Sequence, residues 1–295
     1  MYNPRVSADA PDTPVPEPSA HGVGWKVSFQ VVQKRGAPHR SPAVAGTLWL
    51  CIAATMGCAI VSRFPSDCSV RESAPRATYL AEIKRDLQEA WPDNRTITIV
   101  CHGHSVPAGY FETPTVDSLH AYPHLLLTKL KQHYPNAVIN VIVTAIGGEN
   151  AVSGAARFQR DVLPHHPDVV TIDYALNDRG NGLERSRMAW EQMIASARAR
   201  GVKVILLTPT PDQQSDLADP DDPLYQHARQ VRELAALHQV GLVDSLALFQ
   251  QRIQEGIRLG DLMAQVNHPN SAGHELVAEG LMEWFEQEDP PAGEE

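Results

Sequence analysis

The chain has 295 residues, 43% of them hydrophobic, which is enough to build one large domain around a sizeable core. Its formal net charge is −10, from 25 Lys and Arg against 35 Asp and Glu, and it contains no block of basic residues. We therefore exclude nucleic acid as a partner, because binding to a phosphate backbone needs clustered positive charge.

The N-terminal part of the chain has the composition of two different segments. Residues 1–41 are rich in Pro, Ser and Ala and show no periodicity, so we predict a disordered extension. Residues 42–62 carry no charge, follow Lys34, Arg35 and Arg40, and are long enough to span a bilayer. We expect a hydrophobic anchor or signal-like segment, with a buried helix of the folded domain as the alternative. The first interpretation predicts an extracytoplasmic or membrane-anchored protein, and the second a cytoplasmic one.

A linker separates this segment from the folded domain. Residues 63–76 contain two prolines and mixed charge, and we place the boundary at their end. The folded domain is predicted to cover 77–288, and the acidic tail 289–295 has no role that we can assign. The domain begins with residues 77–90, whose apolar spacing is that of a helix, and Pro92 ends it.

From residue 96 onward, predicted strands alternate with predicted helices of ten or more residues. Five β-branched residues at 96–100 indicate a buried first strand. Further strands are predicted at 137–144, 168–174, 203–208 and 240–243, and helices at 119–134, 151–163, 183–200, 223–238, 245–257 and 272–286. This alternation is typical of a parallel sheet with right-handed crossovers. We predict a three-layer α/β/α sandwich with a five-stranded parallel sheet, since five strands are too few for an eightfold barrel.

The carboxyl ends of these strands carry the polar residues of interest. In an open parallel sheet these ends share one edge, where ligands bind. The first strand leads to Ser105, the second to a glycine turn that contains Gly148, and the third to Asn177, while His268 precedes the last helix. Each of them could serve alone as a turn, a cap or a packing residue. Because all four residues are expected at the same edge of the sheet, we favour a shared functional site.

These residue types match the needs of acyl transfer. A serine hydroxyl is a weak nucleophile and needs an adjacent base, which His268 can supply to Ser105. The oxyanion that forms needs preorganised donors, and the Gly148 and Ser105 backbone N–H groups and the Asn177 amide can provide them. The sequence therefore predicts a serine esterase with Ser105, His268, Gly148 and Asn177 as its catalytic residues.

The same motifs resemble those of the SGNH hydrolases, the GDSL esterase/lipase superfamily, over residues 96–285. Four blocks carry the resemblance in order: Gly103-His104-Ser105, Ile146-Gly147-Gly148-Glu149-Asn150, Leu176-Asn177-Asp178, and His268-Pro269-Asn270. The resemblance implies the flavodoxin-like SGNH fold, no metal or organic cofactor, and an acyl-serine intermediate. It implies carboxylic ester substrates, for which we expect short-chain acyl or O-acetyl groups on carbohydrate or lipid.

Two positions depart from the family pattern. His104 stands where the family has Asp, and Gln265 stands where the family has Asp, three residues before the catalytic histidine. In a Ser-His-Asp triad this second carboxylate fixes the imidazole tautomer, and exchanging it for an amide costs about 10⁴ in rate. Either His268 works in a dyad oriented by a backbone carbonyl, or Asp261 supplies the carboxylate, or the enzyme is weak or inactive. We favour the dyad, because every other group that the chemistry needs is present.

Two other functions stay open at this point. His102 and His104 form an H-x-H pair that resembles the start of an amidohydrolase metal site, although no further ligands follow at later strand ends. The Gln265 departure also allows a non-catalytic module that binds an acylated or glycan ligand. The four cysteines lack metal-ligand spacing and the density of a disulfide framework, so we interpret them as packing residues. The loops 107–118 and 212–222 are expected to flank the site and shape its pockets.

Overall fold

The computed structural model describes residues 72–217 and 219–286. The predicted extension 1–41, the segment 42–62 and the tail 289–295 lie outside the described residues. Among the described helices, none combines the length and the apolar character needed to cross a bilayer.

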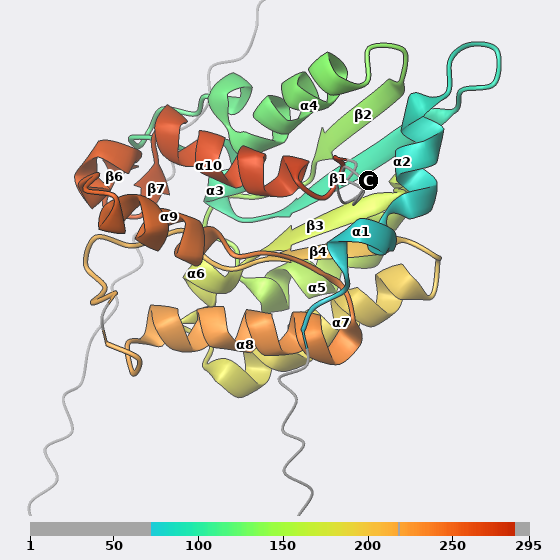
Figure 1. The fold of residues 1–295 in the computed structure, drawn as a ribbon. Helices are drawn as coiled ribbons and strands as arrows, with labels where there is room; N and C mark the ends of the chain where they lie inside the picture. The colour runs from blue at the N-terminus through green and yellow to red at the C-terminus, as the bar shows by residue number, and fades with distance from the viewer. Residues whose placement is uncertain (1–71, 218, 287–295) are drawn as a thin grey trace, which may run out of the picture. The chain divides into compact units, whose positions relative to one another are not determined.

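Five strands form one parallel sheet in the order β2-β1-β3-β4-β5 (Figure 1). The strands are β1 (Thr96–Gly103), β2 (Val138–Val143), β3 (Val169–Asp173), β4 (Lys203–Leu207) and β5 (Gly241–Val243). The prediction of a five-stranded parallel sheet is confirmed. Because β2 pairs on one side of β1 and all later strands follow on the other, the direction of chain progression reverses at β1, where such sheets bind ligands.

Helices cover both faces of the sheet, and together they make the predicted three layers (Figure 1). One face packs against α2 (Ala81–Gln88), α4 (Tyr122–His133), α9 (Ser245–Gln254) and α10 (Ser271–Met282). The other packs against α5 (Ala151–Asp161), α7 (Leu183–Arg198) and α8 (Pro223–His238), of which α8 also reaches the first cluster. Successive β1 residues point to opposite faces: Ile99 and Cys101 join the first cluster, and Val100 joins the second.

Local sequence signals fix where several of these helices begin. The side chains of Asn150, Asp222, Asp244 and Asn270 accept hydrogen bonds from backbone N–H groups in the first turns of α5, α8, α9 and α10. Such caps satisfy N–H groups that have no partner within the helix. Two of them, Asn150 and Asn270, lie in the motifs that carry the predicted site.

Short elements are where the structure differs from the sequence prediction. The helix predicted at 77–90 divides at Leu80 into α1 (Arg76–Tyr79) and α2, and the helix predicted at 119–134 divides into η1 (Ser118–His120) and α4. Unpredicted elements are α3 (Ser105–Ala108), α6 (Ala175–Asp178), η2 (Leu163–His165), η3 (Leu259–Leu262) and the antiparallel pair β6 (Met263–Gln265) and β7 (His268–Pro269). Elements of two to four residues are too short to show a hydrophobic period, so the sequence pattern cannot reveal them.

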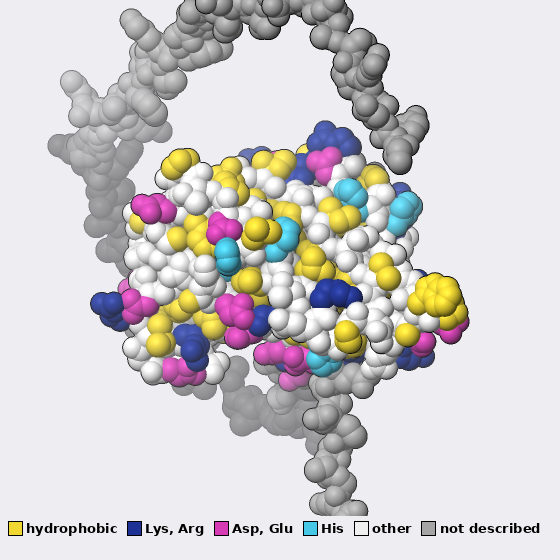
Figure 2. Space-filling view, turned by 90° about the horizontal axis from the view of Figure 1, so that it is seen from above, with side chains coloured by type: hydrophobic (Ala, Val, Ile, Leu, Met, Phe, Trp, Pro, Cys, Tyr) yellow, Lys and Arg dark blue, Asp and Glu magenta, His cyan; other side chains and the backbone are white. Residues whose placement is uncertain are grey.

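The surface has no strongly charged face in the view of Figure 2. Lys and Arg side chains lie scattered there, several of them beside Asp or Glu side chains, and small hydrophobic groups lie between them. Cys101, the cysteine within the described residues, is a free thiol buried in the sheet, and burial raises its pKa to about 12. It therefore behaves as a packing residue, as predicted.

Candidate active site

Ser105 lies at the carboxyl end of β1, where it begins the single turn of α3. The strands β1 and β3 approach each other so closely here that a Cβ on Gly103 would lie 2.5 Å from the Asp173 carbonyl oxygen. The His104 N–H donates to that same oxygen at 3.2 Å, and the His104 side chain caps α3 by accepting from the Val106 N–H. As the first residue of a helix, Ser105 has a backbone N–H without an intrahelical partner. The turn thus fixes both the hydroxyl and the amide at the sheet edge.

The β6–β7 pair brings His268 to this serine from the other end of the chain. The His268 Nε2 lies 2.9 Å from the Ser105 Oγ, although 163 positions separate the two residues. The Asn270 N–H donates to the Leu262 carbonyl, which fixes the pair at the start of α10. The two side chains are therefore in hydrogen-bond contact, as a nucleophile and its general base must be.

The other ring nitrogen of His268 meets a backbone carbonyl. The Phe111 oxygen lies 2.9 Å from His268 Nδ1. A base that accepts the serine proton at Nε2 must carry its hydrogen at Nδ1, and that hydrogen can be donated to Phe111. Asp261 is exposed and pairs with Arg258 at 2.7 Å, so the geometry gives the Asp261 alternative no support. The contact with Phe111 is the one that a Ser-His dyad oriented by a backbone carbonyl requires.

Gln265 also reaches His268 Nδ1, but it presents a hydrogen-bond donor to this nitrogen, where an acceptor is needed. Gln265 Oε1 accepts from the Thr113 N–H at 3.0 Å, which turns Nε2 toward His268 Nδ1 at 2.8 Å. When Nδ1 carries its hydrogen, two donors face each other across this contact. The amide therefore favours the tautomer with the hydrogen on Nε2, which cannot accept the proton of Ser105.

The imidazole of His268 is set to be neutral near pH 7. Partial burial lowers its pKa below the ordinary 6.5, and nearby His104 lowers this pKa further, while the hydrogen bond with the Phe111 carbonyl opposes the shift. A neutral imidazole is the form that can take a proton from a hydroxyl group.

The glycine turn after β2 presents a free amide at the same edge. Gly148 has φ +79°, in the left-handed region that favours glycine, and a Cβ there would meet nothing within 4 Å. The Glu149 N–H closes the turn onto the Ile146 carbonyl at 3.3 Å, and the Ile146 N–H binds the Gly103 carbonyl at 3.0 Å. The Gly148 N–H has no hydrogen-bond partner among the described residues. The turn is thus tied to the loop that carries Ser105 and keeps one donor unused.

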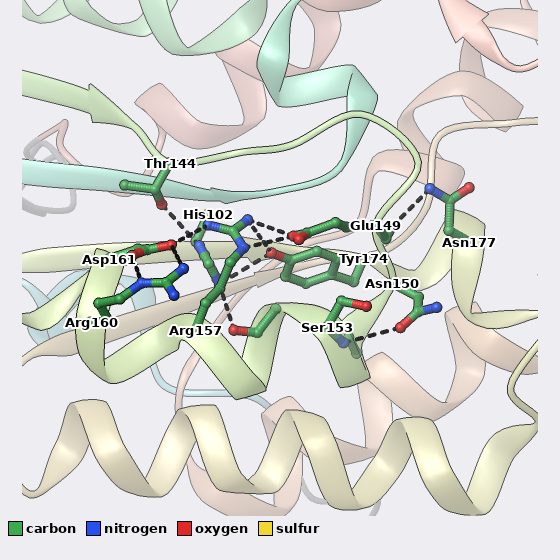
Figure 3. Close-up of polar contacts among 12 residues, drawn as sticks. His102, Thr144, Glu149, Asn150, Ser153, Arg157, Arg160, Asp161, Tyr174 and Asn177 are labelled. Carbon is green, nitrogen blue, oxygen red and sulfur yellow. Dashed lines mark hydrogen bonds and ion pairs between the residues drawn. The ribbon is translucent and has the colours of Figure 1, made fainter. Parts of the chain in front are cut away.

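Asn177 joins this turn from α6. Its side-chain Nδ2 donates to the Glu149 carbonyl at 2.8 Å, the contact drawn at the right of Figure 3. A carboxamide nitrogen has two hydrogens, so one N–H of Asn177 is left for another acceptor. Among the four predicted site residues, Ser105 contacts His268 directly, and Asn177 contacts Glu149, the residue after Gly148. The hydrogen bond from Ile146 to Gly103 links the Gly148 turn to the loop that carries Ser105.

The geometry gives the H-x-H metal alternative no support. Both ring nitrogens of His102 are engaged inside the protein: Nδ1 lies 2.8 Å from Thr144 Oγ1, and Nε2 lies 3.1 Å from the Tyr174 hydroxyl (Figure 3). Burial lowers the pKa of His102 to about 4. His104 Nε2 faces Asp173 Oδ1 at 3.3 Å. Within residues 72–217 and 219–286, no group of three or more His, Cys, Asp or Glu side chains could hold a metal ion.

The two loops expected to flank the site make different contacts. In the first, Tyr110 bridges to Val116, and its ring lies 6.0 Å from that of His268. In the acidic loop, Asp212 is buried and pairs with Arg179 at 2.7 Å, and Asp222 caps α8. These two carboxylates therefore serve the fold.

Sequence reasoning missed three groups at this site: the Phe111 carbonyl, the buried His104–Asp173 pair and an ion pair behind the Gly148 turn. A backbone carbonyl carries no side-chain signal, so nothing could have identified Phe111. Asp173 had a signal, because an acidic residue ends the otherwise uncharged segment Val169–Ile172. A charge at the end of a buried strand needs a partner.

A model of the GDSL-like Lipase/Acylhydrolase family matches residues 101–276. Among solved structures, the chain resembles Axe2, an acetylxylan esterase from Geobacillus stearothermophilus, with a TM-score of 0.57 and 21% identity over 65% of this chain and 95% of that one. It also resembles a two-domain esterase active on acetylated mannans, with a TM-score of 0.58 and 19% identity over 77% of this chain and 60% of that one. No curated protein sequence matches the chain significantly.

The Axe2 structures include three alanine variants that are described as catalytic. They replace a serine, an aspartate and a histidine, and the aspartate precedes the histidine by three positions. The chain described here has Gln265 at that spacing from His268.

Proposed function

Since this chain belongs to the GDSL-like lipase/acylhydrolase family, we propose that it removes short acyl groups, above all O-acetyl groups on carbohydrate, through an acyl-serine intermediate. As a member of that family it is a carboxylic ester hydrolase, and family membership favours hydrolysis over a module that only binds ligands. Two esterases of similar fold act on acetylated xylan and mannan, which supports the choice of an acetylated carbohydrate over a lipid ester.

In the proposed mechanism, His268 Nε2 takes the hydroxyl proton while Ser105 Oγ attacks the ester carbonyl carbon. The carbonyl oxygen becomes an oxyanion, which accepts hydrogen bonds from the Ser105 N–H, the Gly148 N–H and the free N–H of Asn177. His268 then donates its proton to the leaving alcohol as the ester bond breaks, which leaves an acyl-serine. Water repeats the cycle: His268 takes a proton from it, the oxygen attacks the acyl carbon, and Ser105 recovers its proton.

The observation that carries this proposal is the 2.9 Å contact between Ser105 Oγ and His268 Nε2 at the carboxyl edge of the sheet. The Phe111 carbonyl orients the imidazole in place of a carboxylate. A carbonyl can accept the Nδ1 hydrogen but carries no full charge, so it stabilises the imidazolium less than a carboxylate does. We therefore expect a working but slow enzyme.

The test is hydrolysis of para-nitrophenyl acetate by the full chain and by its Ser105→Ala variant. We expect the wild type to turn over with a burst of nitrophenol and the variant to lose at least about 10³ in kcat, since the residual rate comes from binding and the oxyanion donors alone. The matched control is Ser153→Ala, which changes a serine of α5 whose N–H binds Asn150 but whose hydroxyl is not part of the proposed mechanism. Equal activity in Ser105→Ala and the wild type would refute the serine mechanism.

The substrate class is tested separately, by acetate release from acetylated xylo-oligosaccharides against hydrolysis of a short-chain triglyceride. A higher kcat/KM on the oligosaccharide supports the carbohydrate ester, and the reverse order would assign a lipid ester to the same site.

We also propose that residues 42–62 attach the enzyme to a membrane on its extracytoplasmic side, because this uncharged segment follows three basic residues. Fractionation of cells that express the full chain or a 42–62 deletion tests this location. Recovery of both forms in the soluble fraction would contradict it.

A further inference from the structure

Glu149, the residue that follows Gly148, forms a partly buried ion pair with Arg157 (Figure 3). Arg157 of α5 has a side chain only 7% exposed, and its Nη2 lies 2.7 Å from the Glu149 Oε2. Its Nε donates to the same oxygen, also at 2.7 Å. Two short charge-assisted contacts on one oxygen restrict the carboxylate strongly. The mechanism given above uses neither side chain.

Glu149 connects this ion pair to two of the three proposed oxyanion donors, the Gly148 N–H and the Asn177 amide. It is the residue after Gly148, and its own N–H closes the turn onto Ile146. Its carbonyl oxygen accepts from Asn177 Nδ2 at 2.8 Å. A single residue thus contacts Arg157 through its side chain, Ile146 through its N–H and Asn177 through its carbonyl. Any movement of Glu149 moves the Gly148 N–H and the Asn177 amide together.

Arg157 is itself fixed from the other side. Its Nη2 donates to the Tyr174 hydroxyl at 3.0 Å, and its Nη1 lies 3.4 Å from Asp161 Oδ2. The Tyr174 ring packs on Gly154 so closely that a Cβ there would lie 2.3 Å from the ring. The Tyr174 hydroxyl also meets His102, whose low pKa keeps its ring neutral, so the guanidinium faces no second positive charge from this histidine.

The turn needs such support because of its composition. Gly147 and Gly148 are adjacent, and glycine has the largest backbone freedom of any residue. A donor stabilises an oxyanion fully only when it is already aimed at the position where the charge develops. The restraint must therefore come from outside the turn. The Ile146–Gly103 hydrogen bond and the Tyr110 ring against Gly147 hold its first half, and the contacts of Glu149 hold its second half.

We propose that Arg157 and Glu149 are positioning residues of the oxyanion hole, which align the Gly148 N–H with the Asn177 amide. The inference rests on the proposed function, because it assigns these two residues to the site of ester hydrolysis. The proposal adds a residue of α5 to a site whose other residues lie in short segments at the carboxyl edge of the sheet.

The test compares kcat and KM of the full-length wild type, Glu149→Gln, Arg157→Lys and the double variant on para-nitrophenyl acetate. Glu149→Gln keeps the size of the side chain and one acceptor oxygen but removes the charge. We expect each single variant to lose about tenfold to a hundredfold in kcat, below the loss of about 10²–10³ for a deleted oxyanion donor. KM and the pH midpoint of kcat/KM should stay unchanged, because His268 and the binding surface are unaltered. The double variant should lose no more than the larger single loss, since both changes break one pair.

Arg160→Lys is the matched control for Arg157→Lys. It makes the same exchange on the same helix, but Arg160 is 77% exposed and contacts Asp161 rather than the turn. We expect this control to keep its kcat and each variant to keep a cooperative thermal transition. Unchanged kcat in Glu149→Gln would overturn the inference, as would a loss in Arg160→Lys equal to that in Arg157→Lys.

The inference and the proposed function fail in different ways. If the wild type is active and Ser105→Ala is inactive, but Glu149→Gln and Arg157→Lys match the wild type, only the positioning role is wrong. If Ser105→Ala keeps full activity, the proposed function itself is wrong.

Discussion

At the scale of single residues, the unusual feature of this site is the surroundings of His268. Its Nδ1 meets the Phe111 carbonyl at 2.9 Å and the Gln265 Nε2 at 2.8 Å, and no carboxylate of the described residues lies within ion-pair distance of the ring. A carbonyl accepts the Nδ1 hydrogen, whereas the amide nitrogen opposes it. The neutral imidazole is therefore favoured over the imidazolium that forms during catalysis.

This balance predicts the pH dependence of the enzyme. Burial lowers the pKa of His268 below 6.5, and only the neutral ring can act as base, so kcat/KM should rise with pH through a midpoint below 6.5. A pH profile on para-nitrophenyl acetate measures the midpoint. A midpoint above 7 would contradict the neutral, carbonyl-oriented imidazole.

Replacing Gln265 with Glu should improve the site. A carboxylate can accept from both the Thr113 N–H and His268 Nδ1, and its charge raises the pKa of the imidazole and stabilises the imidazolium. We expect Gln265→Glu to move the pH midpoint upward and to raise kcat by at least about tenfold, part of the 10⁴ that the opposite exchange costs in a triad. Gln265→Met is the control, because it removes the opposing donor without adding charge. A lower kcat in Gln265→Glu than in Gln265→Met would show that the carboxylate does not reach the ring productively.

At the scale of elements, the position of His268 depends on the helix that follows it. Asn270 Oδ1 accepts from the Gly273 N–H at 3.1 Å and so caps α10, while its Nδ2 donates to the Asp261 carbonyl at 2.8 Å. One side chain therefore connects the start of α10 to η3 and the β6–β7 pair. This arrangement links a helix cap to the geometry of the proposed base.

We expect Asn270→Ala to lower both stability and activity. Loss of an N-cap costs about 1 kcal/mol, and loss of the contact with Asp261 frees the segment that carries His268. Thermal unfolding and kcat measure the two effects. Asp222→Ala, which removes the cap of α8, is the control and should lower stability by a similar amount while leaving kcat unchanged. Equal kcat in the two variants would show that the cap of α10 does not affect catalysis.

At the scale of the whole molecule, several buried histidines determine how stability depends on pH. Burial lowers the pKa of His102 and His227 to about 4 and that of His274 to about 3, against 6.5 for an ordinary histidine. Between pH 6.5 and 4 the unfolded chain therefore binds protons at these side chains that the folded chain does not bind. Asp178 acts in the opposite direction, because burial raises its pKa from 3.8 to about 6. The three histidines outweigh the single aspartate, so the free energy of unfolding decreases as the pH falls.

We expect the free energy of unfolding to decrease by about 2–3 kcal/mol per pH unit between pH 6 and pH 4.5, from a net uptake of about two protons. Urea unfolding of the wild type at several pH values measures this slope. His227→Gln should reduce it, since His227 contacts none of the proposed catalytic residues. Constant stability over this range would mean that the buried rings accept protons without unfolding.

The sequence alone determined the alternating α/β architecture and the edge of the sheet at which chemistry is expected. Hydrophobic period and helix caps are local properties, and the carboxyl ends of parallel strands must share one edge. This is why Ser105, Gly148 and Asn177 could be assigned to one edge from their place after successive strands. Elements of two to four residues, such as β7 with His268, are too short for the same argument.

Only the tertiary structure decided how the site is oriented and supported. The Phe111 carbonyl meets a histidine 157 positions away, and a main-chain oxygen carries no sequence signal. The contact between Arg157 and Glu149 spans eight positions, but its place behind the Gly148 turn depends on how α5 packs against the sheet. Gln265 shows the same division: the sequence identified an amide where a carboxylate was expected, and its direction toward His268 Nδ1 follows from the Thr113 N–H that its oxygen accepts. Residue types and their order are written in the chain, whereas directions and distances arise only when remote segments pack together.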